Sequence, residues 1–360
     1  MLQDQGYQVH VAANFNMGNT SSAERIEEFK TELDQKGIRW FQIDFDRNVM
    51  NFAADIKAYR QVLKLQREQQ YTLIHCHTPI GGAIGRMVAH RCHVPVIYTA
   101  HGFHFYKGAP KKSWLIFYPI EKFLSRYTDE LLVINSEDFR LAKSKLHMKR
   151  LMYLPGVGVD VHKDIVPDNI RREIREELEI PQDGFMITCA AEFSKNKNQI
   201  TVIQAIEQLK NPNIYYVMCG IGEKKRQMEE YVKEHGLSSN IKFAGFRKDI
   251  HEILQTSDCF VLSSIREGLS VALMEAMTEG LPVVCGRIRG NIDLIEDGKG
   301  GCLVEPTHIE DYCKAFEKLY EMKTSDSKQF AEIGLFNINM IKKFSCEQVD
   351  NKMRKIYQDV

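Results

Sequence analysis

The sequence has no CxxC pair of cysteines and no excess charge of either sign. Its nine cysteines stand singly, several of them inside apolar runs, and its formal net charge is zero at pH 7. Scattered cysteines in apolar segments are typical of reduced, buried thiols, so we expect neither a disulfide framework nor a zinc site. A net charge of zero argues against a dedicated nucleic-acid binder.

Long apolar runs are also missing. No segment comes near the roughly 18–20 apolar residues that a membrane-spanning helix needs, and the first residues do not have the pattern of a secretory signal. We therefore expect a cytoplasmic protein that is at most peripheral to the cytoplasmic face of a membrane. The 360 residues are enough for two domains that each bury a core.

What the sequence does contain is a regular alternation of short β-rich runs with amphipathic helical patterns. Strands are predicted at 7–13, 40–44, 73–77, 96–100, 131–135 and 151–154, and then at 186–190, 214–219, 241–244, 259–262 and 282–285. Helical patterns lie between them, for example at 23–35, 53–69, 224–235 and 271–279, and the pattern after residue 309 is helical. This alternation predicts βαβ crossovers, parallel sheets covered by helices, and ligand sites at the carboxyl ends of the strands.

The domain organisation follows from this alternation. A turn-rich and then charged segment at 155–179 predicts a hinge. We place an N-terminal domain at 1–165, a C-terminal domain at 166–342 and a terminal helix at 343–360 that crosses back to the first domain. The chain opens on MLQDQG, which is typical of a helix end capped by Gly6, whereas a doubly wound domain should open on a strand. The first βα unit is therefore expected to be missing, and a misassigned start codon is the simpler explanation.

Two glutamates, Glu267 and Glu275, stand eight positions apart just after the apolar run 259–263. The predicted order is strand, glycine-containing turn and helix start, which directs free backbone N–H groups and the positive end of a helix dipole beyond the strand. An anion fits there, and the two carboxylates can accept hydrogen bonds from hydroxyl groups. The segment therefore predicts a nucleotide-sugar site, while a solvated helix start has the same spacing.

Seven motifs occur in an order that makes the chain resemble family 4 glycosyltransferases of the GT-B fold. They are TAHGFHFYKGAP (99–110), INSED (134–138), LPGVGVDVHKD (154–164), AEFSKNKNQ (191–199), FAGFRKDI (243–250), EGLSVALMEAM (267–277) and GLPVVCGRIRGNIDLIEDGKGGCLV (280–304). Within that family the chain is most similar to bacterial polysaccharide-biosynthesis enzymes of the EpsD, CapM and PglA type. The resemblance implies two Rossmann-like α/β domains facing across a cleft, with the sugar nucleotide on the C-terminal domain and the acceptor on the N-terminal one.

The resemblance also implies residue roles in the donor site. Glu267 would contact the hydroxyls of the donor sugar and take part in catalysis, and Glu275 would accept hydrogen bonds from the ribose. The other donor-binding residues would be Lys197, Phe246, Arg247, Gly268, Leu269, Ser270 and Val271. Among these, the turn from Gly268 would present N–H groups to the diphosphate, Lys197 would bind the leaving diphosphate, and Phe246 with Arg247 would border the base.

The sequence departs from the broader family at one position. Many members have an arginine where this chain has Glu192. The resemblance to EpsD-like members implies that this is a subfamily trait. It leaves the donor phosphates with less positive charge, for which Lys195 or Arg287 are the candidate substitutes.

In the N-terminal half, the resemblance makes His101 a catalytic residue that contacts the donor sugar, and it puts His77, His104 and Phe105 on the acceptor side. His75 and His77 flank Cys76 on one predicted strand, so both imidazoles project to the same face. No further ligand is spaced to complete a metal site, and GT-B enzymes work without a catalytic metal. We therefore expect no metal and no cofactor beyond the nucleotide sugar, most simply a UDP-sugar.

The segment at 114–119 is an aromatic and aliphatic run preceded by Lys107, Lys111 and Lys112. That composition suits a helix at the anionic inner leaflet of a membrane or one that lines a groove for a polyprenyl chain; a core helix packed on the sheet has the same composition. Acceptors of the similar enzymes are often lipid-linked saccharides.

Taken with the resemblance, these features predict a retaining transferase. It would move a hexose or N-acetylhexosamine from a UDP-sugar to a polyprenyl-diphosphate-linked saccharide in the synthesis of an exopolysaccharide, capsule or glycan. Two alternatives stay open at this point. One is a UDP-sugar 2-epimerase of the same fold, and the other is a truncated transferase without activity.

Overall fold

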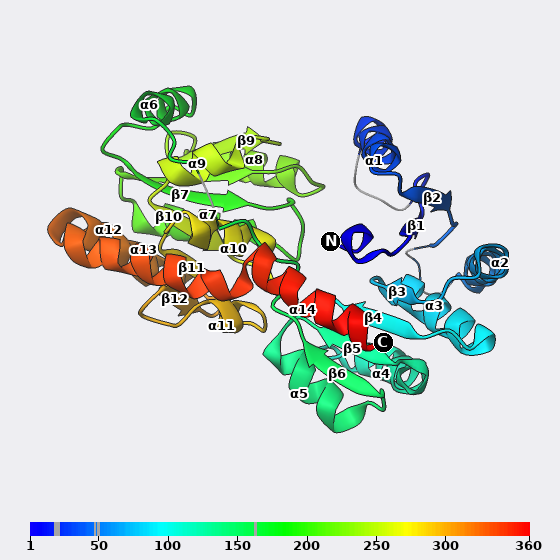
Figure 1. The fold of residues 1–360 in the computed structure, drawn as a ribbon. Helices are drawn as coiled ribbons and strands as arrows, with labels where there is room; N and C mark the ends of the chain where they lie inside the picture. Colours follow the sequence, from blue (N-terminus) through cyan, green and yellow to red (C-terminus); the bar gives the residue numbers. More distant parts are fainter. Residues whose placement is uncertain (18–21, 47, 49–50, 162–163) are drawn as a thin grey trace. The chain divides into compact units, whose positions relative to one another are not determined.

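In the computed structural model, the chain is described over residues 1–17, 22–46, 48, 51–161 and 164–360, so part of the segment 154–164 lies outside it. The chain forms two compact units. The first combines Met1–Leu154 with Asp350–Val360, and the second is Pro155–Val349. Each unit is built of parallel strands and covering helices (Figure 1), as the alternation in the sequence predicted.

The strands of the first unit lie in two separate parallel sheets. One pairs β1 (His10–Ala13) with β2 (Arg39–Gln42). The other has the order β3 (Ile74–Cys76), β4 (Val96–Ala100), β5 (Glu130–Val133) and β6 (Arg150–Tyr153). β4 and β5 are buried along their whole length, whereas β1 is half-exposed. Within the described residues no strand joins the two sheets, so β1 and β3 each have an unpaired edge.

The helices of the first unit begin where the sequence offers caps. They are η1 (Gln3–Gln5), α1 (Ala23–Gln35), α2 (Phe52–Gln69), α3 (Pro79–Cys92), α4 (Lys111–Leu124), η2 (Ser125–Tyr127) and α5 (Ser136–Lys145). The side chains of Ser22, Asn51, Thr78 and Asn135 each accept a hydrogen bond from a backbone N–H of the first turn of α1, α2, α3 and α5, which satisfies a donor that the helix itself cannot. The opening turn η1 ends at Gly6 with φ 84°, as its sequence predicted.

The second unit contains one six-stranded parallel sheet in the order β12-β11-β10-β7-β8-β9. Its strands are β7 (Phe185–Ala190), β8 (Ile214–Cys219), β9 (Ile241–Gly245), β10 (Cys259–Leu262), β11 (Val283–Gly286) and β12 (Gly301–Val304). β12 was not predicted, because its glycine-rich surroundings hide it. A Cβ atom on Gly301 would lie 1.9 Å from the Val283 oxygen, so only glycine lets this strand approach β11.

Helices cover both faces of this sheet. They are α6 (Asp168–Glu177), α7 (Gln199–Leu209), α8 (Lys225–Glu234), α9 (Ile250–Thr256), α10 (Val271–Thr278), α11 (Asn291–Leu294), α12 (Ile309–Ser325), α13 (Ser327–Ile341) and η3 (Lys342–Phe344). Along β7 the side chains alternate: Phe185 and Ile187 pack with α7, α8 and α12, and Met186 packs with α6 and α9. The last helix, α14 (Cys346–Asp359), begins in the second unit and its residues from Asp350 belong to the first.

Candidate donor and acceptor sites

The carboxyl ends of five neighbouring strands, β11-β10-β7-β8-β9, meet at one edge of the second unit's sheet, because every pairing between them is parallel. The loops that follow these strands contain, in the same order, Arg289, Glu267, Lys197, Gly220 and Phe246. Parallel α/β sheets place their ligand sites at this edge. The sheet order therefore brings together loops that are far apart in the sequence.

The turn after β10 has the geometry that the sequence predicted. β10 is fully buried, and α10 starts at Val271 with Ser270 as its cap, whose Oγ accepts a hydrogen bond from the Leu273 N–H at 3.3 Å. Gly268 and Leu269 lie half-buried before the cap. Gly290 in the neighbouring loop has φ 81°, and a Cβ atom there would lie 2.3 Å from the Gly268 oxygen. The two loops thus touch through their main chains, where only glycine fits.

Lys197 and Glu267 form an ion pair in this loop cluster. The Lys197 Nζ lies 2.6 Å from the Glu267 Oε1, and the two side chains are 24% and 13% exposed. The loops that carry them are tied together as well, because the Asn196 amide donates to the Arg266 carbonyl at 2.9 Å and the Ile265 N–H donates to the Asn196 carbonyl at 2.8 Å. The structure therefore places the predicted phosphate ligand directly beside the predicted sugar ligand.

Arg289 is a residue of this cluster that the sequence reasoning missed. Its side chain is almost fully buried, and its Nε donates a hydrogen bond to the main-chain oxygen of Glu267 at 3.2 Å. A guanidinium is costly to bury unless it is bound by acceptors. The only signal for Arg289 in the sequence was a charged residue that stands between the apolar run of β11 and Gly290.

The glycines after β8 were missed in the same way. A Cβ atom on Gly220 would lie 2.1 Å from the Ala191 oxygen, and one on Gly222 would lie 2.4 Å from the Phe193 oxygen. The loop after β8 therefore lies flat against the loop after β7, which leads to Lys197. Two glycines one residue apart after an apolar strand were the available signal.

The two residues considered as substitutes for the missing arginine, Lys195 and Arg287, have different surroundings. Glu192 and Lys195 are both exposed. Arg287 donates to the Leu303 carbonyl at 3.1 Å and pairs with Asp297, so β12 holds its guanidinium. Of the arginines after β11, Arg289 is the one bonded to the donor loop.

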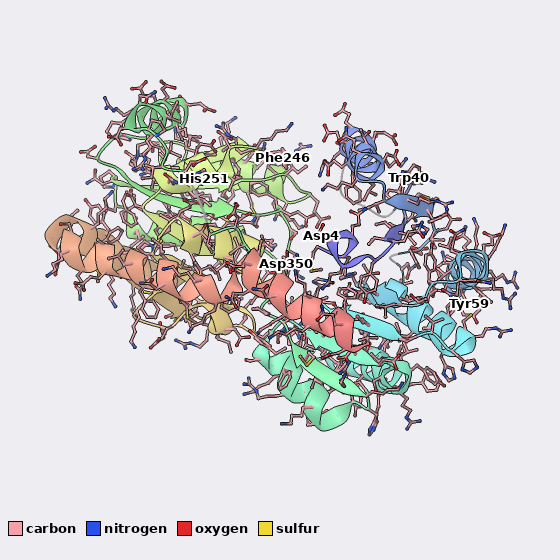
Figure 2. The ribbon with its side chains drawn as sticks, viewed as in Figure 1. Asp4, Trp40, Tyr59, Phe246, His251 and Asp350 are labelled. Atoms are coloured by element: carbon pink, nitrogen blue, oxygen red, sulfur yellow. The ribbon has the colours of Figure 1, made fainter. Side chains whose placement is uncertain are left out.

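The remaining donor-side predictions lie on α10 and after β9. Glu275 lies half-buried on α10, one turn before the end of that helix. Phe246 is 69% exposed and projects from the end of β9 (Figure 2). Arg247 is bound on both sides, because it donates to Asp249 at 2.6 and 2.8 Å and pairs with Glu177. The exposed ring of Phe246 is thus the freer of the two groups for contact with a base.

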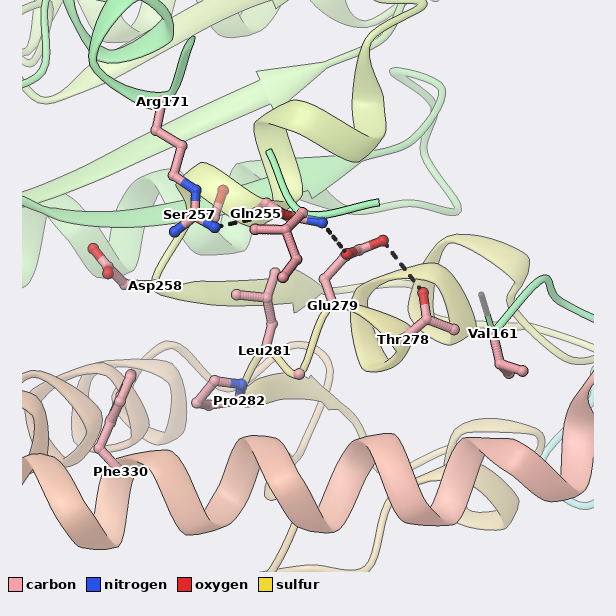
Figure 3. A pocket seen from close by; sticks show the side chains of 12 residues that line it. Val161, Arg171, Gln255, Ser257, Asp258, Thr278, Glu279, Leu281, Pro282 and Phe330 are labelled. Atoms are coloured by element: carbon pink, nitrogen blue, oxygen red, sulfur yellow. Dashed lines mark hydrogen bonds between the residues drawn. The ribbon is translucent and has the colours of Figure 1, made fainter. Parts of the chain in front are cut away.

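A polar hollow of about 410 Å³ lies elsewhere on the second unit. Its residues Asp258 and Pro282 come directly before β10 and β11, so it opens at the amino ends of the strands. The Gln255 amide donates to Glu279 at 3.0 Å, and Arg171 and Thr278 complete the chain of hydrogen bonds (Figure 3). These side chains hydrogen-bond to one another. Among the described residues that line this hollow, none is a predicted site residue.

In the first unit, three histidines gather at the ends of β3 and β4. The His77 Nδ1 lies 3.3 Å from the His101 Nε2, and the rings of His75 and His77 are 4.2 Å apart. His75 also contacts the Thr99 hydroxyl at 2.8 Å and the Tyr357 hydroxyl of α14.

Desolvation lowers the pKa of all three imidazoles, although His75 is only half-buried and His77 and His101 are exposed. For His75 desolvation is the larger cause, and the neighbouring His77 and His101 add to it, so its pKa is about 3. For His77 desolvation and then His101 lower the pKa to about 4. The cluster is therefore neutral at physiological pH, and its imidazoles can act as hydrogen-bond donors and acceptors.

His104 and Phe105 differ from each other in their placement. The His104 ring stacks on Phe117 of α4 with 4.6 Å between centroids and lines a hollow of about 620 Å³ that also contains His75 and His77. Phe105 is 1% exposed and packs against Phe103 and Trp114. Its ring belongs to the core of the unit, so it lies behind the residues that an acceptor would touch.

Neither a metal centre nor a membrane span is present in the described part of the chain. No group of three or more His, Cys, Asp or Glu side chains is placed there to hold a metal ion. Asp44 and Asp46 have the spacing of a carboxylate pair that could bind a metal ion, but Asp44 accepts a hydrogen bond from Gln61 and pairs with Lys57. No described helix has both the length and the apolarity to cross a bilayer.

Comparison with known proteins decides the family. Residues 170–334 match the family described as glycosyl transferases group 1, and residues 1–135 match the one described as glycosyl transferase 4-like. A protein named as a glycosyltransferase, EpsD from Bacillus subtilis (strain 168), is 35% identical over 326 residues, which are 89% of this chain and 81% of the relative. The chain belongs to the group 1 glycosyltransferases. It is thus a transferase enzyme, as its motifs implied.

Two further relatives extend the comparison of this glycosyltransferase. An Escherichia coli protein named UDP-Gal:alpha-D-GlcNAc-diphosphoundecaprenol alpha-1,3-galactosyltransferase is 27% identical over 339 residues, covering 91% of this chain and 85% of the relative. The crystal structure of Anabaena Alr3699/HepE in complex with UDP-glucose matches with a TM-score of 0.79 at 17% identity, covering 98% of this chain and 99% of the other. This structural match confirms the GT-B fold.

Proposed function

We propose that this enzyme transfers a hexose or N-acetylhexosamine from a UDP-sugar to a polyprenyl-diphosphate-linked saccharide, with retention of the anomeric configuration. The observation that carries the donor half is the pairing of Lys197 with Glu267 beside the turn that starts α10. A cation, a carboxylate and free N–H groups at one sheet edge suit a sugar diphosphate. The UDP and UDP-glucose complexes of the Anabaena protein support UDP as the nucleotide.

In the proposed reaction, the diphosphate leaves toward Lys197 and the N–H groups of Gly268–Ser270. The bond from the anomeric carbon to the phosphate oxygen breaks as positive charge builds on the ring. The acceptor hydroxyl forms its bond on the face that the phosphate leaves, and its proton goes to a departing phosphate oxygen. Glu267 is held by Lys197 and serves in this scheme as a hydroxyl acceptor, not as a covalent nucleophile.

The acceptor half rests on the first unit. The neutral imidazoles of His77 and His101 provide hydrogen-bond partners for hydroxyls at the ends of β3 and β4. The lipid-linked acceptor in the name of the Escherichia coli relative supports a polyprenyl-linked substrate. The EpsD relative, together with a Rhizobium meliloti relative named for lipopolysaccharide core biosynthesis, supports a role in surface polysaccharide synthesis.

Peripheral binding to the cytoplasmic face of the membrane follows from the acceptor. On α4, Leu115 and Phe123 are 77% and 51% exposed, and Lys111 and Lys112 lie exposed at the start of the helix. Apolar and basic side chains on one helix suit an anionic bilayer surface. Sedimentation with vesicles of phosphatidylglycerol, but not of phosphatidylcholine alone, is the expected behaviour.

A product assay tests the function. The full-length enzyme is incubated with a panel of UDP-sugars and saccharide-diphosphate-polyprenols, and mass spectrometry identifies the product while NMR identifies the new anomeric bond. We expect UDP to be released only when an acceptor is present. The new glycosidic bond should have the same anomeric configuration, axial or equatorial, as the bond in the UDP-sugar. Release of UDP without an acceptor, with an epimerised sugar, would instead support the 2-epimerase, and inversion would refute the retaining mechanism.

A further inference from the structure

A groove between α2, α3 and α4 is not used by the donor chemistry. It has a cavity volume of about 190 Å³ and lies within the first unit. Apolar side chains from all three helices line it, among them Phe52, Ile80, Met87, Phe117, Ile120 and Leu124.

α4 presents two adjoining apolar faces at this groove. Phe117, Ile120 and Leu124 follow one another at helical spacing along the groove wall. Ile116 and Phe123 lie beside them and stay 41% and 51% exposed. α4 turns Trp114, Phe117 and Tyr118 partly buried to the core, as a surface helix normally does, but of its residues only Glu121 and Leu124 are fully buried. Apolar surface of this kind is typical of a binding face.

The rim and the floor of the groove suit a hydrocarbon. Phe52 on α2 and Met87 on α3 are 67% and 37% exposed at the rim. At the floor, Arg86 and Glu121 neutralise each other in a buried bidentate pair, with Nη2 and Oε2 3.0 Å apart. Asp55 on α2 adds a further carboxyl group at the lining of the groove.

The groove adjoins the hollow that His75 and His77 line. Ile80, His104 and Phe117 line both the groove and the larger hollow with His75 and His77. Lys111 and Lys112 lie exposed at the first turn of α4, and neither ammonium group pairs with a carboxylate of the described residues. A ligand that contacts both the two lysines and the apolar groove has an anionic head and a long apolar tail.

We propose that the groove binds the isoprene units of the acceptor next to its diphosphate, and that the diphosphate lies near the first turn of α4. This rests on the proposed function, which supplies the polyprenyl-linked acceptor. The lysines then match the charge of the diphosphate, while the tail runs along Phe117, Ile120 and Leu124. The groove thereby fixes the distance between the lipid and the sugar that receives the transferred residue.

Farnesyl diphosphate is the probe, because it carries the proposed head and tail and stays soluble in water. Its affinity for the full-length enzyme is measured by calorimetry beside that of inorganic diphosphate. Farnesyl diphosphate should bind at least about tenfold more tightly, since the tail loses its contact with water. In Ile120→Asp the affinity should fall at least about tenfold, because a carboxylate then meets the hydrocarbon.

Leu115→Asp is the matched control, on the same helix and more exposed than Ile120 but outside the groove lining. It should keep its affinity for farnesyl diphosphate, and both variants should keep the melting temperature of the wild type. Equal losses in the two variants, or no loss in Ile120→Asp, would overturn the groove. So would weaker binding of Ile120→Asp to phosphatidylglycerol vesicles at unchanged farnesyl diphosphate affinity, because Ile120 would then belong with Leu115 to the face that docks on a bilayer.

The transfer assay separates this inference from the function on which it rests. In one outcome, no pair of UDP-sugar and lipid-linked acceptor gives a product, but Ile120→Asp has a lower affinity for farnesyl diphosphate and Leu115→Asp does not. The proposed function then fails and the groove stands. If transfer occurs and Ile120→Asp has the wild-type KM for long and short polyprenyl acceptors, the function stands and the groove fails.

Discussion

The ammonium group of Lys197 lies 2.6 Å from the carboxylate of Glu267, although 70 residues separate them in the sequence. β7 and β10 are parallel neighbours, so the loops after them meet at one edge. The pair keeps both charges in place while both side chains remain partly open to solvent. A donor that binds here would replace the ion pair between Lys197 and Glu267. The cation and the carboxylate are already oriented before it binds.

Lys197→Met should lower kcat by about a hundredfold to a thousandfold, because it removes one charge that stabilises the leaving diphosphate. Steady-state UDP release with saturating substrates measures this loss. Lys233→Met, an exposed lysine on α8 to which no role in the donor site is assigned, is the control and should keep its kcat. Similar losses in both variants would contradict a specific role for Lys197.

Arg289→Gln should weaken UDP binding at least about tenfold and leave uridine binding nearly unchanged, since the arginine holds the main chain of Glu267 in the loop that faces the phosphates. Arg289→Lys should fall between this variant and the wild type, because it keeps the charge but loses the planar fork. Calorimetric titration with UDP and with uridine gives both affinities. A role confined to folding would instead lower the two affinities together.

Glu275→Ala should remove the preference of the enzyme for UDP over 2′-deoxyUDP. A carboxylate that accepts a hydrogen bond from the ribose makes that hydroxyl worth about tenfold in affinity. Competition between the two nucleotides for the wild type and the variant tests this. An unchanged preference in the variant would take Glu275 out of the ribose site.

His75 should make the stability of the wild type fall as the pH drops below about 6.5. Its folded pKa is about 3, whereas the unfolded imidazole titrates near its ordinary value of about 6.5. In that window the unfolded state binds a proton that the folded state does not, so the stabilisation is complete above pH 6.5 and is lost toward pH 3.

Urea unfolding of His75→Gln at several pH values measures this contribution. The free energy of unfolding of the wild type should fall between pH 6 and pH 4 by about 1.4 kcal/mol per pH unit more than that of the variant. Parallel pH profiles for the two proteins would show that His75 is not the group responsible.

The sequence predicted the alternating elements well, and it predicted the strand–turn–helix around Glu267, because these depend on short-range patterns. It could not predict which strands are neighbours, and so it did not bring Lys197 to Glu267. β12 was missed because a strand that begins with Gly301 has no apolar alternation. Arg247 is bound by Glu177, 70 residues away, a contact that no local pattern records.

Phe105 shows the same limit on the acceptor side. The motif around it indicates a loop at the end of β4, but alternate residues of such a loop turn to opposite sides. His104 lines a hollow, and Phe105 enters the core. Only the packing of α4 decides which of the two is accessible.

The chain enters the first unit twice, and this affects the order in which the protein can form. Tyr357 contacts His75, and its carbonyl accepts a hydrogen bond from the Tyr7 hydroxyl at 2.8 Å. A ribosome makes Tyr7 and His75 before the second unit and Tyr357 after it. The first unit therefore cannot complete its packing until Asp350–Val360 has been made, and the second unit is made before that segment.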